Sequence, residues 1–125
     1  MDRNIKIYLK DIIVAIEAIE KFVKDLDFAE IKNNDLISSE VIRKFELIGE
    51  AAKNIPKEIT EKYPEIPWKV LVAFRDKLIH FYFGIKYDIV WETIKSKLPE
   101  LKENIKRIME GFENGNEKWK ISYIK

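Results

Sequence analysis

Apolar residues recur at every third or fourth position along this chain, and that spacing restricts it to helices. In the first 27 residues the apolar side chains keep to one helical face at about 100° per residue. They are Ile5, Leu9, Ile12, Ile16, Ile19, Val23 and Leu26. The pattern predicts a first helix over residues 3–27.

A polar stretch over residues 32–35 interrupts this pattern, and a second helix follows it. Asp35 or Ser38 is placed to cap its N-terminus, and Pro56 ends it. Side-chain bulk is missing at three positions within it, Gly49, Ala51 and Ala52. We therefore expect a neighbouring helix to cross closely there.

Prolines divide the next part of the chain into further helices. A short amphipathic turn is expected over residues 57–62, and Pro67 stands where a third helix over residues 68–83 can begin, since the first helical position needs no N–H. Asp88 is placed to cap a fourth helix, and Pro99 either kinks that helix or starts a fifth.

These helices predict an all-α, up-and-down bundle of four to five helices. Residues 1–115 form the expected single domain, and residues 116–125 form a C-terminal tail whose alternating pattern suits a short strand or a partner-binding segment. A length of 125 residues leaves no room for a second domain with its own core.

Charge and composition narrow the classes of function. With 23 Lys and Arg against 22 Asp and Glu, the chain has a formal net charge of +1, so binding to nucleic acid or a membrane would need a local patch. The sequence has no apolar stretch long enough to span a membrane and no signal-peptide pattern, which predicts a cytoplasmic protein.

The chain has no cysteine and one histidine, which argues against most metal sites. Its four glycines form neither a Walker loop nor a dinucleotide fingerprint. We therefore expect no metal and no cofactor.

The segment over residues 74–84 is the one place where Arg75, Asp76, His80 and Tyr82 come together. Arg75 and Tyr82 are about two helical turns apart and point the same way, while Asp76 precedes His80 by one turn, so its carboxylate can reach the imidazole. Histidine can transfer protons near neutral pH and arginine can bind phosphate, a combination suited to phosphodiester cleavage.

Nearby residues could assist this chemistry. Lys69 and Lys77 would attract an RNA backbone, and Tyr82 offers a hydroxyl and a stacking face. The spacing alone also allows a simpler interpretation, in which Arg75 and His80 are surface or capping residues at the end of an aromatic-rich helix.

A signature and four flanking segments, in order along the chain, resemble the HepT-like proteins of the HEPN superfamily. The R-x4-H-x-Y signature is formed by Arg75, His80 and Tyr82, and the segments 45–53 and 66–68 resemble the family sequences that precede this signature. Residues 88–91 and 98–101 continue the match downstream, so that the resemblance covers about residues 1–112.

The resemblance implies a metal-independent endoribonuclease, the toxin of a type VII toxin–antitoxin pair. It implies a symmetric homodimer in which Arg75 and His80 of both protomers line one cleft that cleaves an RNA such as a tRNA or mRNA. It also implies a minimal nucleotidyltransferase of the MntA type as antitoxin partner, which transfers AMP to Tyr82. Asp76 is expected to support the site, and Glu50 either approaches the same cleft or serves the helix crossing.

Two other hypotheses use the same residues. The chain could be a non-catalytic, nucleotide-binding or regulatory subunit of a nucleotidyltransferase, or a purely structural dimeric bundle. RNA cleavage that depends on Arg75 and His80 would distinguish the ribonuclease from both of these alternatives.

Overall fold

A computed structural model describes residues 3–80 and 85–111 of the chain, and every regular element in that part is a helix. The elements are α1 (Arg3–Val23), α2 (Phe28–Asn33), α3 (Asp35–Lys53), α4 (Lys57–Lys62), α5 (Trp68–His80), α6 (Tyr87–Glu92), the π-helix η2 (Thr93–Lys97) and α7 (Leu98–Gly111). The predicted all-α class is confirmed.

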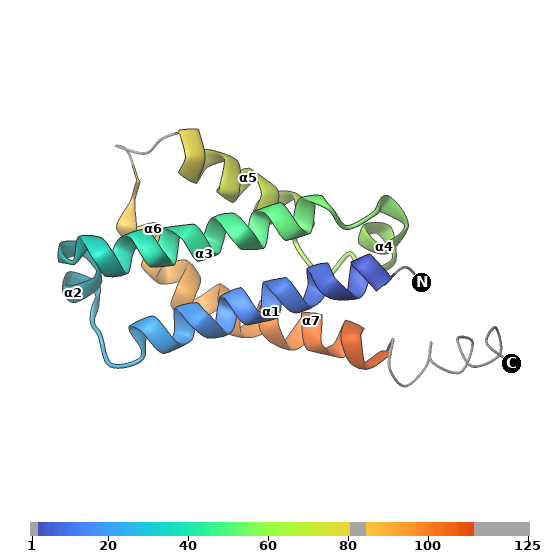
Figure 1. Cartoon of the computed structure of the whole chain (residues 1–125), viewed down its shortest axis with the longest axis horizontal. Helices are drawn as coiled ribbons and strands as arrows, with labels where there is room; N and C mark the ends of the chain where they lie inside the picture. The colour runs from blue at the N-terminus through green and yellow to red at the C-terminus, as the bar shows by residue number, and fades with distance from the viewer. Residues whose placement is uncertain (1–2, 81–84, 112–125) are drawn as a thin grey trace, which may run out of the picture.

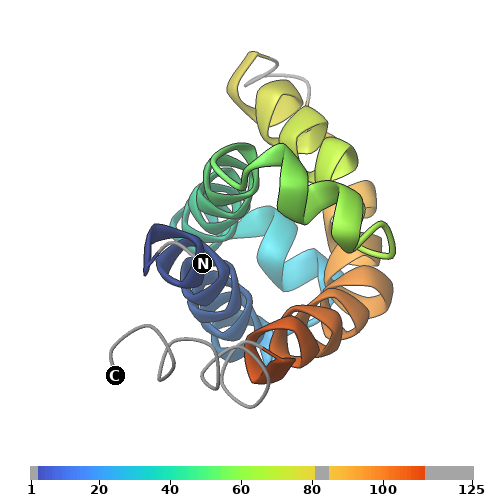
Figure 2. The same ribbon diagram turned by 90° about the vertical axis from the view of Figure 1, so that its right-hand side faces the viewer.

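The long helices run up and down (Figure 1), as predicted. The helix α1 packs against α3 on one side and α7 on the other, and α3 also packs against α5. Seen end-on, α5 is an outer helix beside α3 rather than a member of the central group (Figure 2). The helix that carries the candidate site is therefore held mainly by α3.

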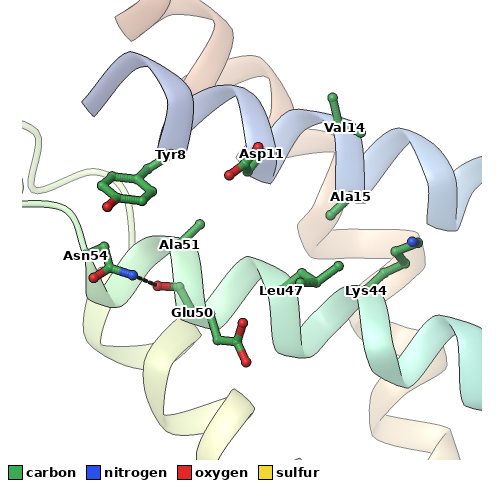
Figure 3. Close-up of a pocket in the computed structure, with 9 residues that line it drawn as sticks. All are labelled: Tyr8, Asp11, Val14, Ala15, Lys44, Leu47, Glu50, Ala51 and Asn54. Carbon is green, nitrogen blue, oxygen red and sulfur yellow. Dashed lines mark hydrogen bonds between the residues drawn. The ribbon is translucent and has the colours of Figure 1, made fainter. Parts of the chain in front are cut away.

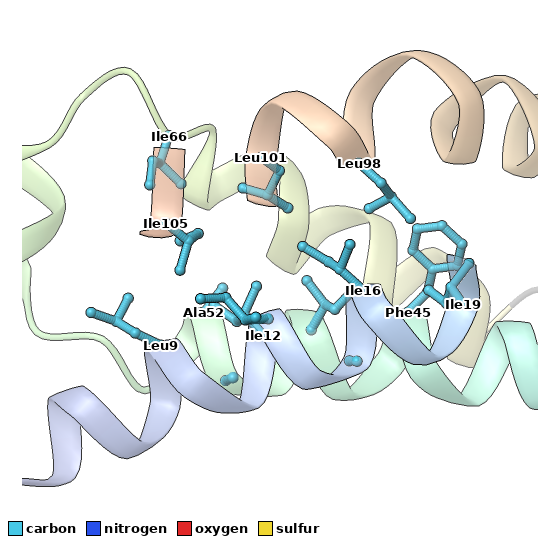
Figure 4. Close-up of a cluster of buried hydrophobic side chains, with 14 of the residues drawn as sticks. Leu9, Ile12, Ile16, Ile19, Phe45, Ala52, Ile66, Leu98, Leu101 and Ile105 are labelled. Atoms are coloured by element: carbon cyan, nitrogen blue, oxygen red, sulfur yellow. The ribbon is translucent and has the colours of Figure 1, made fainter. Parts of the chain in front are cut away.

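The core is mainly aliphatic and is centred where α1, α3 and α7 meet (Figure 4). Several of its side chains are almost completely buried, among them Leu9, Ile12, Ile16, Ile19, Ile48, Leu98 and Ile105. Those on α1 belong to the apolar series that predicted the first helix. Burial of this much hydrocarbon is the main favourable term for such a fold.

The ends of the first two long helices differ from the prediction. The helix α1 ends at Val23 rather than at residue 27, because Asp27 caps the short helix α2 instead. The Glu30 amide donates to Asp27 Oδ1 at 2.8 Å, and the Asp27 amide donates to Glu30 Oε1 at 3.2 Å, which forms a capping box. The cap of α3 is Asn34, not Asp35 or Ser38, and α3 ends at Lys53, three residues before Pro56.

The short helix α4 and the start of α5 agree with the prediction, but the cap of the next helix does not. The residue before α6 is Lys86, and Asp88 lies inside the first helical turn, so the prediction of an Asp88 cap is wrong. Helix continues without a break from Tyr87 to Gly111 through the π-helix η2. Pro99 has no N–H for a bond to the preceding turn, and the helix widens just before it.

An ion pair between two partly buried side chains joins the first and last helices. Lys102 Nζ on α7 donates to Glu20 Oε1 on α1 at 2.7 Å. This hydrogen bond raises the pKa of the Lys102 ammonium above its ordinary value of 10.5 against the opposing effect of desolvation.

Within the described residues, no helix is both long and apolar enough to cross a membrane. The boundary predicted at residue 115 and the tail over residues 116–125 lie outside the described part of the chain.

Candidate active site

The residues predicted to act together lie on or just beyond α5. Arg75 and Asp76 are in the middle of this helix, and His80 is its last residue. The side chain of His80 and the whole of Tyr82 lie outside the residues that the structure describes, so the expected Asp76–His80 pair stays a prediction. The described geometry of the site is therefore that of Arg75 and its neighbours.

Gly49 of α3 forms the seat on which Arg75 rests. A Cβ at residue 49 would overlap Arg75 Cβ and would lie 2.8 Å from Arg75 Cγ and 3.0 Å from the carbonyl oxygen of Leu71. No residue with a side chain fits that space unless the two helices move apart. The close crossing predicted from the small residues of this segment is confirmed.

Two carboxylates hold the end of the Arg75 side chain. Nη1 donates to Asp76 Oδ1 at 2.9 Å, and Nη2 lies 3.8 Å from Glu50 Oε1 on α3. The side chain of Arg75 is 23% exposed, against 48% for Asp76 and 40% for Glu50. The guanidinium therefore lies at the surface between two acidic groups, one from each helix.

The inner part of the same side chain is desolvated. Arg75 Nε is buried, and no acceptor among the described residues lies within hydrogen-bonding distance of it. An unsatisfied buried donor is unfavourable by about 1–3 kcal/mol and is uncommon in folded proteins outside functional sites. Only the terminal nitrogens of Arg75 are thus available to a ligand.

A second arginine joins this cluster through Glu50. Arg43 of α3 lies with Nη1 3.9 Å from Glu50 Oε1 and 3.5 Å from Glu46 Oε2. Sequence reasoning considered Glu50 and missed Arg43. The spacing of Arg43, Glu46 and Glu50 by three and four residues places them on one stripe of α3, but the link to Arg75 exists only once α5 crosses that stripe.

Grooves run along both sides of α5. One of about 690 Å³ separates it from α6, η2 and α7, and another of about 800 Å³ separates it from α4. Val70 and Ala73 line both grooves, and Lys69 and Lys77 are exposed beside them. Trp68 belongs to the core, because it is buried and its indole N–H donates to the Tyr63 carbonyl at 3.0 Å.

A third groove, of about 380 Å³, lies between α1 and α3 (Figure 3). Glu50 borders it, but its carboxylate lies on the side of α3 away from α1, while Tyr8 and Asp11 face the groove from α1 (Figure 3). This groove and the Arg75 cluster are therefore separate features on two sides of the same helix.

The donor groups of the described residues do not form a metal site. No three side chains of His, Cys, Asp or Glu in that part of the chain lie close enough to hold one ion. The described cluster offers two guanidiniums and their carboxylate partners for chemistry. The backbone of His80 lies about one turn further along α5.

The chain is similar to proteins named as ribonucleases. The family model described as ribonuclease HepT-like matches residues 12–108. A Methanocaldococcus jannaschii protein described as a candidate RNase is 50% identical over 111 residues, which cover 89% of this chain and 96% of that protein. A Thermococcus cleftensis protein described as a probable ribonuclease HepT is 43% identical over 86% of this chain and 98% of its own length. No solved structure matches the chain significantly.

Proposed function

Since the chain belongs to the HepT-like ribonuclease family, we propose that it is a metal-independent endoribonuclease whose catalytic residues are Arg75 and His80. The observation that carries this proposal is the placement of Arg75. Its guanidinium is fixed at the α3–α5 crossing, on the helix that ends with the one histidine of the chain.

Arg75 suits the binding of a phosphodiester in its transition state. Its stem is immobilised against Gly49, so that little rotamer freedom is left to lose when a phosphate binds. Its terminal N–H groups can donate to two phosphate oxygens at once and stabilise the charge that builds up on the pentacoordinate phosphorus.

Proton transfer falls to His80. The neutral imidazole takes the proton from the ribose 2′-hydroxyl, the 2′-oxygen bonds to phosphorus, and the bond from phosphorus to the 5′-oxygen breaks. A protonated imidazole gives its proton to the departing 5′-oxygen, which leaves a 2′,3′-cyclic phosphate. With one histidine per chain, the base and the acid come from two protomers that share a cleft.

The surface of α5 supports such a pairing. Val70 is 64% exposed and Ile79 is 41% exposed on this helix, and Ile89 at the start of the next is 50% exposed. Val70 and Ile89 border the same groove, whereas Ile79 lies nine residues after Val70, on the opposite face of α5 and one turn after Arg75. Exposed large apolar side chains are typical of protein contact sites. A homodimer that covers Ile79 would bring the two copies of Arg75 toward one cleft.

We further propose that the protein is the toxin of a type VII pair and that a minimal nucleotidyltransferase silences it. The hydroxyl oxygen of Tyr82 attacks the α-phosphorus of ATP, AMP is transferred to the tyrosine, and pyrophosphate leaves. The added anion would lie near the helix end that carries His80 and would compete with RNA for Arg75.

RNA cleavage in the presence of EDTA tests the proposed activity. The purified, partner-free protein is incubated with total RNA and with defined tRNA beside His80→Ala and Arg75→Ala. We expect wild type alone to consume full-length RNA and to leave cyclic phosphate ends. Mass spectrometry of the same preparation establishes whether Tyr82 carries AMP.

Intact RNA after incubation with unmodified wild type would overturn the nuclease. The nucleotide-binding or regulatory subunit would then account better for Arg75, His80 and Tyr82 in one signature. Cleavage by the wild type that survives in both variants would retain a nuclease and place its site elsewhere.

A further inference from the structure

One oxygen atom of Glu50 lies between two arginines that come from different helices. Glu50 Oε1 is 3.8 Å from Nη2 of Arg75 and 3.9 Å from Nη1 of Arg43. Because both distances are measured to the same oxygen atom, the separation of the two nitrogens cannot exceed their sum. Neighbouring phosphates of a nucleic-acid strand can span a separation of this size.

Arg43 presents the right chemistry on the solvent side of this pair. Its side chain is 54% exposed, more than twice the fraction of Arg75. Its contacts with Glu46 and Glu50 both use Nη1, so neither occupies the edge formed by Nη2 and Nε. That edge is one with which a guanidinium binds a phosphate through two parallel hydrogen bonds.

We propose that Arg43 binds the phosphate next to the one held by Arg75, so that the site takes a strand with at least two consecutive phosphates. Glu50 acts as the spacer that keeps the two guanidiniums at a fixed separation. This inference rests on the ribonuclease function proposed above, and it adds a subsite on α3 to a site otherwise built on α5.

The local charge makes this second contact important. Three carboxylates, from Glu46, Glu50 and Asp76, face the two guanidiniums, so the described cluster has no excess of positive charge. A single phosphate must compete with those carboxylates for Arg75 alone. A strand that meets both arginines releases more counter-ions and binds more tightly.

Short substrates of defined phosphate number test the subsite. Cleavage of a dinucleoside monophosphate, which has one phosphate, is compared with cleavage of a trinucleoside diphosphate, which has two. We expect wild type to favour the longer substrate in kcat/KM by on the order of tenfold, and Arg43→Gln to lose that preference.

Arg107→Gln is the matched control. Arg107 is an exposed, ion-paired arginine of α7, with Nη2 3.0 Å from Glu103 Oε1 and 68% of its side chain exposed. This variant removes the same charge from a different helix, and we expect it to keep the preference for two phosphates. A preference lost equally in both variants would overturn the subsite, because net charge alone would explain it.

Binding measurements separate this proposal from the nuclease itself. Affinity of His80→Ala for the same two compounds is measured against salt concentration, with and without Arg43→Gln. For the longer compound we expect Arg43→Gln to reduce the slope of log affinity against log salt by about 0.7, the value for one phosphate on a single strand.

Cleavage by wild type and the salt slope of Arg43→Gln separate the two proposals. A reduced slope without cleavage by wild type would keep the Arg43 contact and reject the catalytic function. Cleavage by wild type with an unchanged slope and an unchanged substrate preference in Arg43→Gln would keep the nuclease and reject the Arg43 contact.

Discussion

Arg75 serves packing through one end of its side chain and the proposed chemistry through the other. Its Cβ and Cγ fill the space over Gly49, while Nη1 and Nη2 meet the carboxylates of Asp76 and Glu50. A side chain that is already ordered loses less entropy when it binds a ligand. At the scale of single residues, the seat and the counter-ions can therefore be altered separately.

Substitution of Gly49 alters the seat. In Gly49→Ala the new Cβ would overlap Arg75 Cβ and would lie 3.0 Å from the carbonyl oxygen of Leu71, so α5 would have to move away from α3. We expect a loss of about 1–3 kcal/mol in the free energy of unfolding, as for overpacked cores, together with a large loss of RNA cleavage. Urea denaturation and the cleavage assay measure the two effects.

Gly111→Ala is the control for that substitution. A Cβ at Gly111 would meet no atom within 4 Å among the described residues, so only helix propensity should change. We expect Gly111→Ala to be as stable as wild type or slightly more stable, and to cleave RNA normally. Equal behaviour of the two alanine variants would contradict the close crossing at Gly49.

Substitution of Glu50 alters the counter-ions and leaves the seat intact. Glu50→Gln keeps the size of the side chain and removes one negative charge 3.8 Å from Arg75. We expect KM for RNA to fall about fivefold, because a like charge no longer opposes the phosphate, and kcat to fall because Arg75 is less firmly held. Steady-state kinetics at fixed salt separate the two constants.

Glu46→Gln provides the comparison for Glu50→Gln. Glu46 pairs with Arg43 at 3.5 Å, and no contact between Glu46 and Arg75 is seen among the described residues. We expect its kcat to equal that of wild type. A fall in kcat with unchanged KM in both glutamine variants would indicate a loss of folded protein instead of a positioning role.

At the scale of elements, the existence of the helices could be predicted, as could the bounds of α4 and the start of α5, but the end of α1 and the caps of α3 and α6 could not. The apolar spacing of α1 and the small residues of α3 each depend on one helix face, which the sequence displays directly. The end of α1 depends on which of two competing interactions Asp27 makes, and Asp27 caps α2. Asp88 likewise enters the first turn of α6 and does not cap it.

The candidate site divides in the same way. Arg75 and His80 could be predicted because they share one helix and one family signature. Glu50 and Gly49 were recognisable on their own helix as candidates for the crossing. Arg43 could not be connected to Arg75, because their link through Glu50 depends on the register in which α5 crosses α3.

The ion pair between α1 and α7 yields a prediction about pH. Because the Lys102 pKa is raised in the folded protein, its stabilising effect is fully present below the unfolded value near 10.5 and is lost as pH rises through the folded value. Lys102→Met should lower the free energy of unfolding by on the order of 0.5 kcal/mol at pH 7. The difference from wild type should shrink in urea titrations above pH 10.5.

Lys106→Met tests whether this effect belongs to the close pair. Lys106 joins the same two helices, but its Nζ is 3.9 Å from Glu17 Oε2 and 47% of its side chain is exposed. We expect a smaller loss of stability from this variant. A Lys102→Met difference that stays constant from pH 7 through the alkaline range would reject the electrostatic origin and leave only lost packing of the lysine stem.

At the scale of the whole molecule, the bundle separates stability from the site. The core centres on α1, α3 and α7, while α5 contributes Trp68 and Leu78 to it and is held mainly by α3. The outer side of α5 keeps large apolar groups such as Ile79 exposed, and the chain supplies a single histidine. Both features suit a second copy that completes the site and covers the exposed groups.

Mixed dimers test this arrangement directly. Arg75→Ala and His80→Ala are each expected to be inactive as homodimers, since one has no arginine and the other no histidine in the shared cleft. A dimer with one protomer of each kind keeps one Arg75 and one His80 in that cleft. Co-refolding the two variants should therefore restore part of the RNA cleavage, well below wild type because one proton-transfer group is still missing.

The controls are each variant refolded alone and native mass spectrometry of the mixture, which establishes that mixed dimers form. Activity that appears only in the mixture requires residues from two protomers to act on one phosphate. Mixed dimers without any cleavage would mean either that both copies of His80 are needed at once or that each protomer uses its own Arg75 and His80. In the second case the single histidine would have to serve as both base and acid through water, and the exposed side of α5 would be left without a part in catalysis.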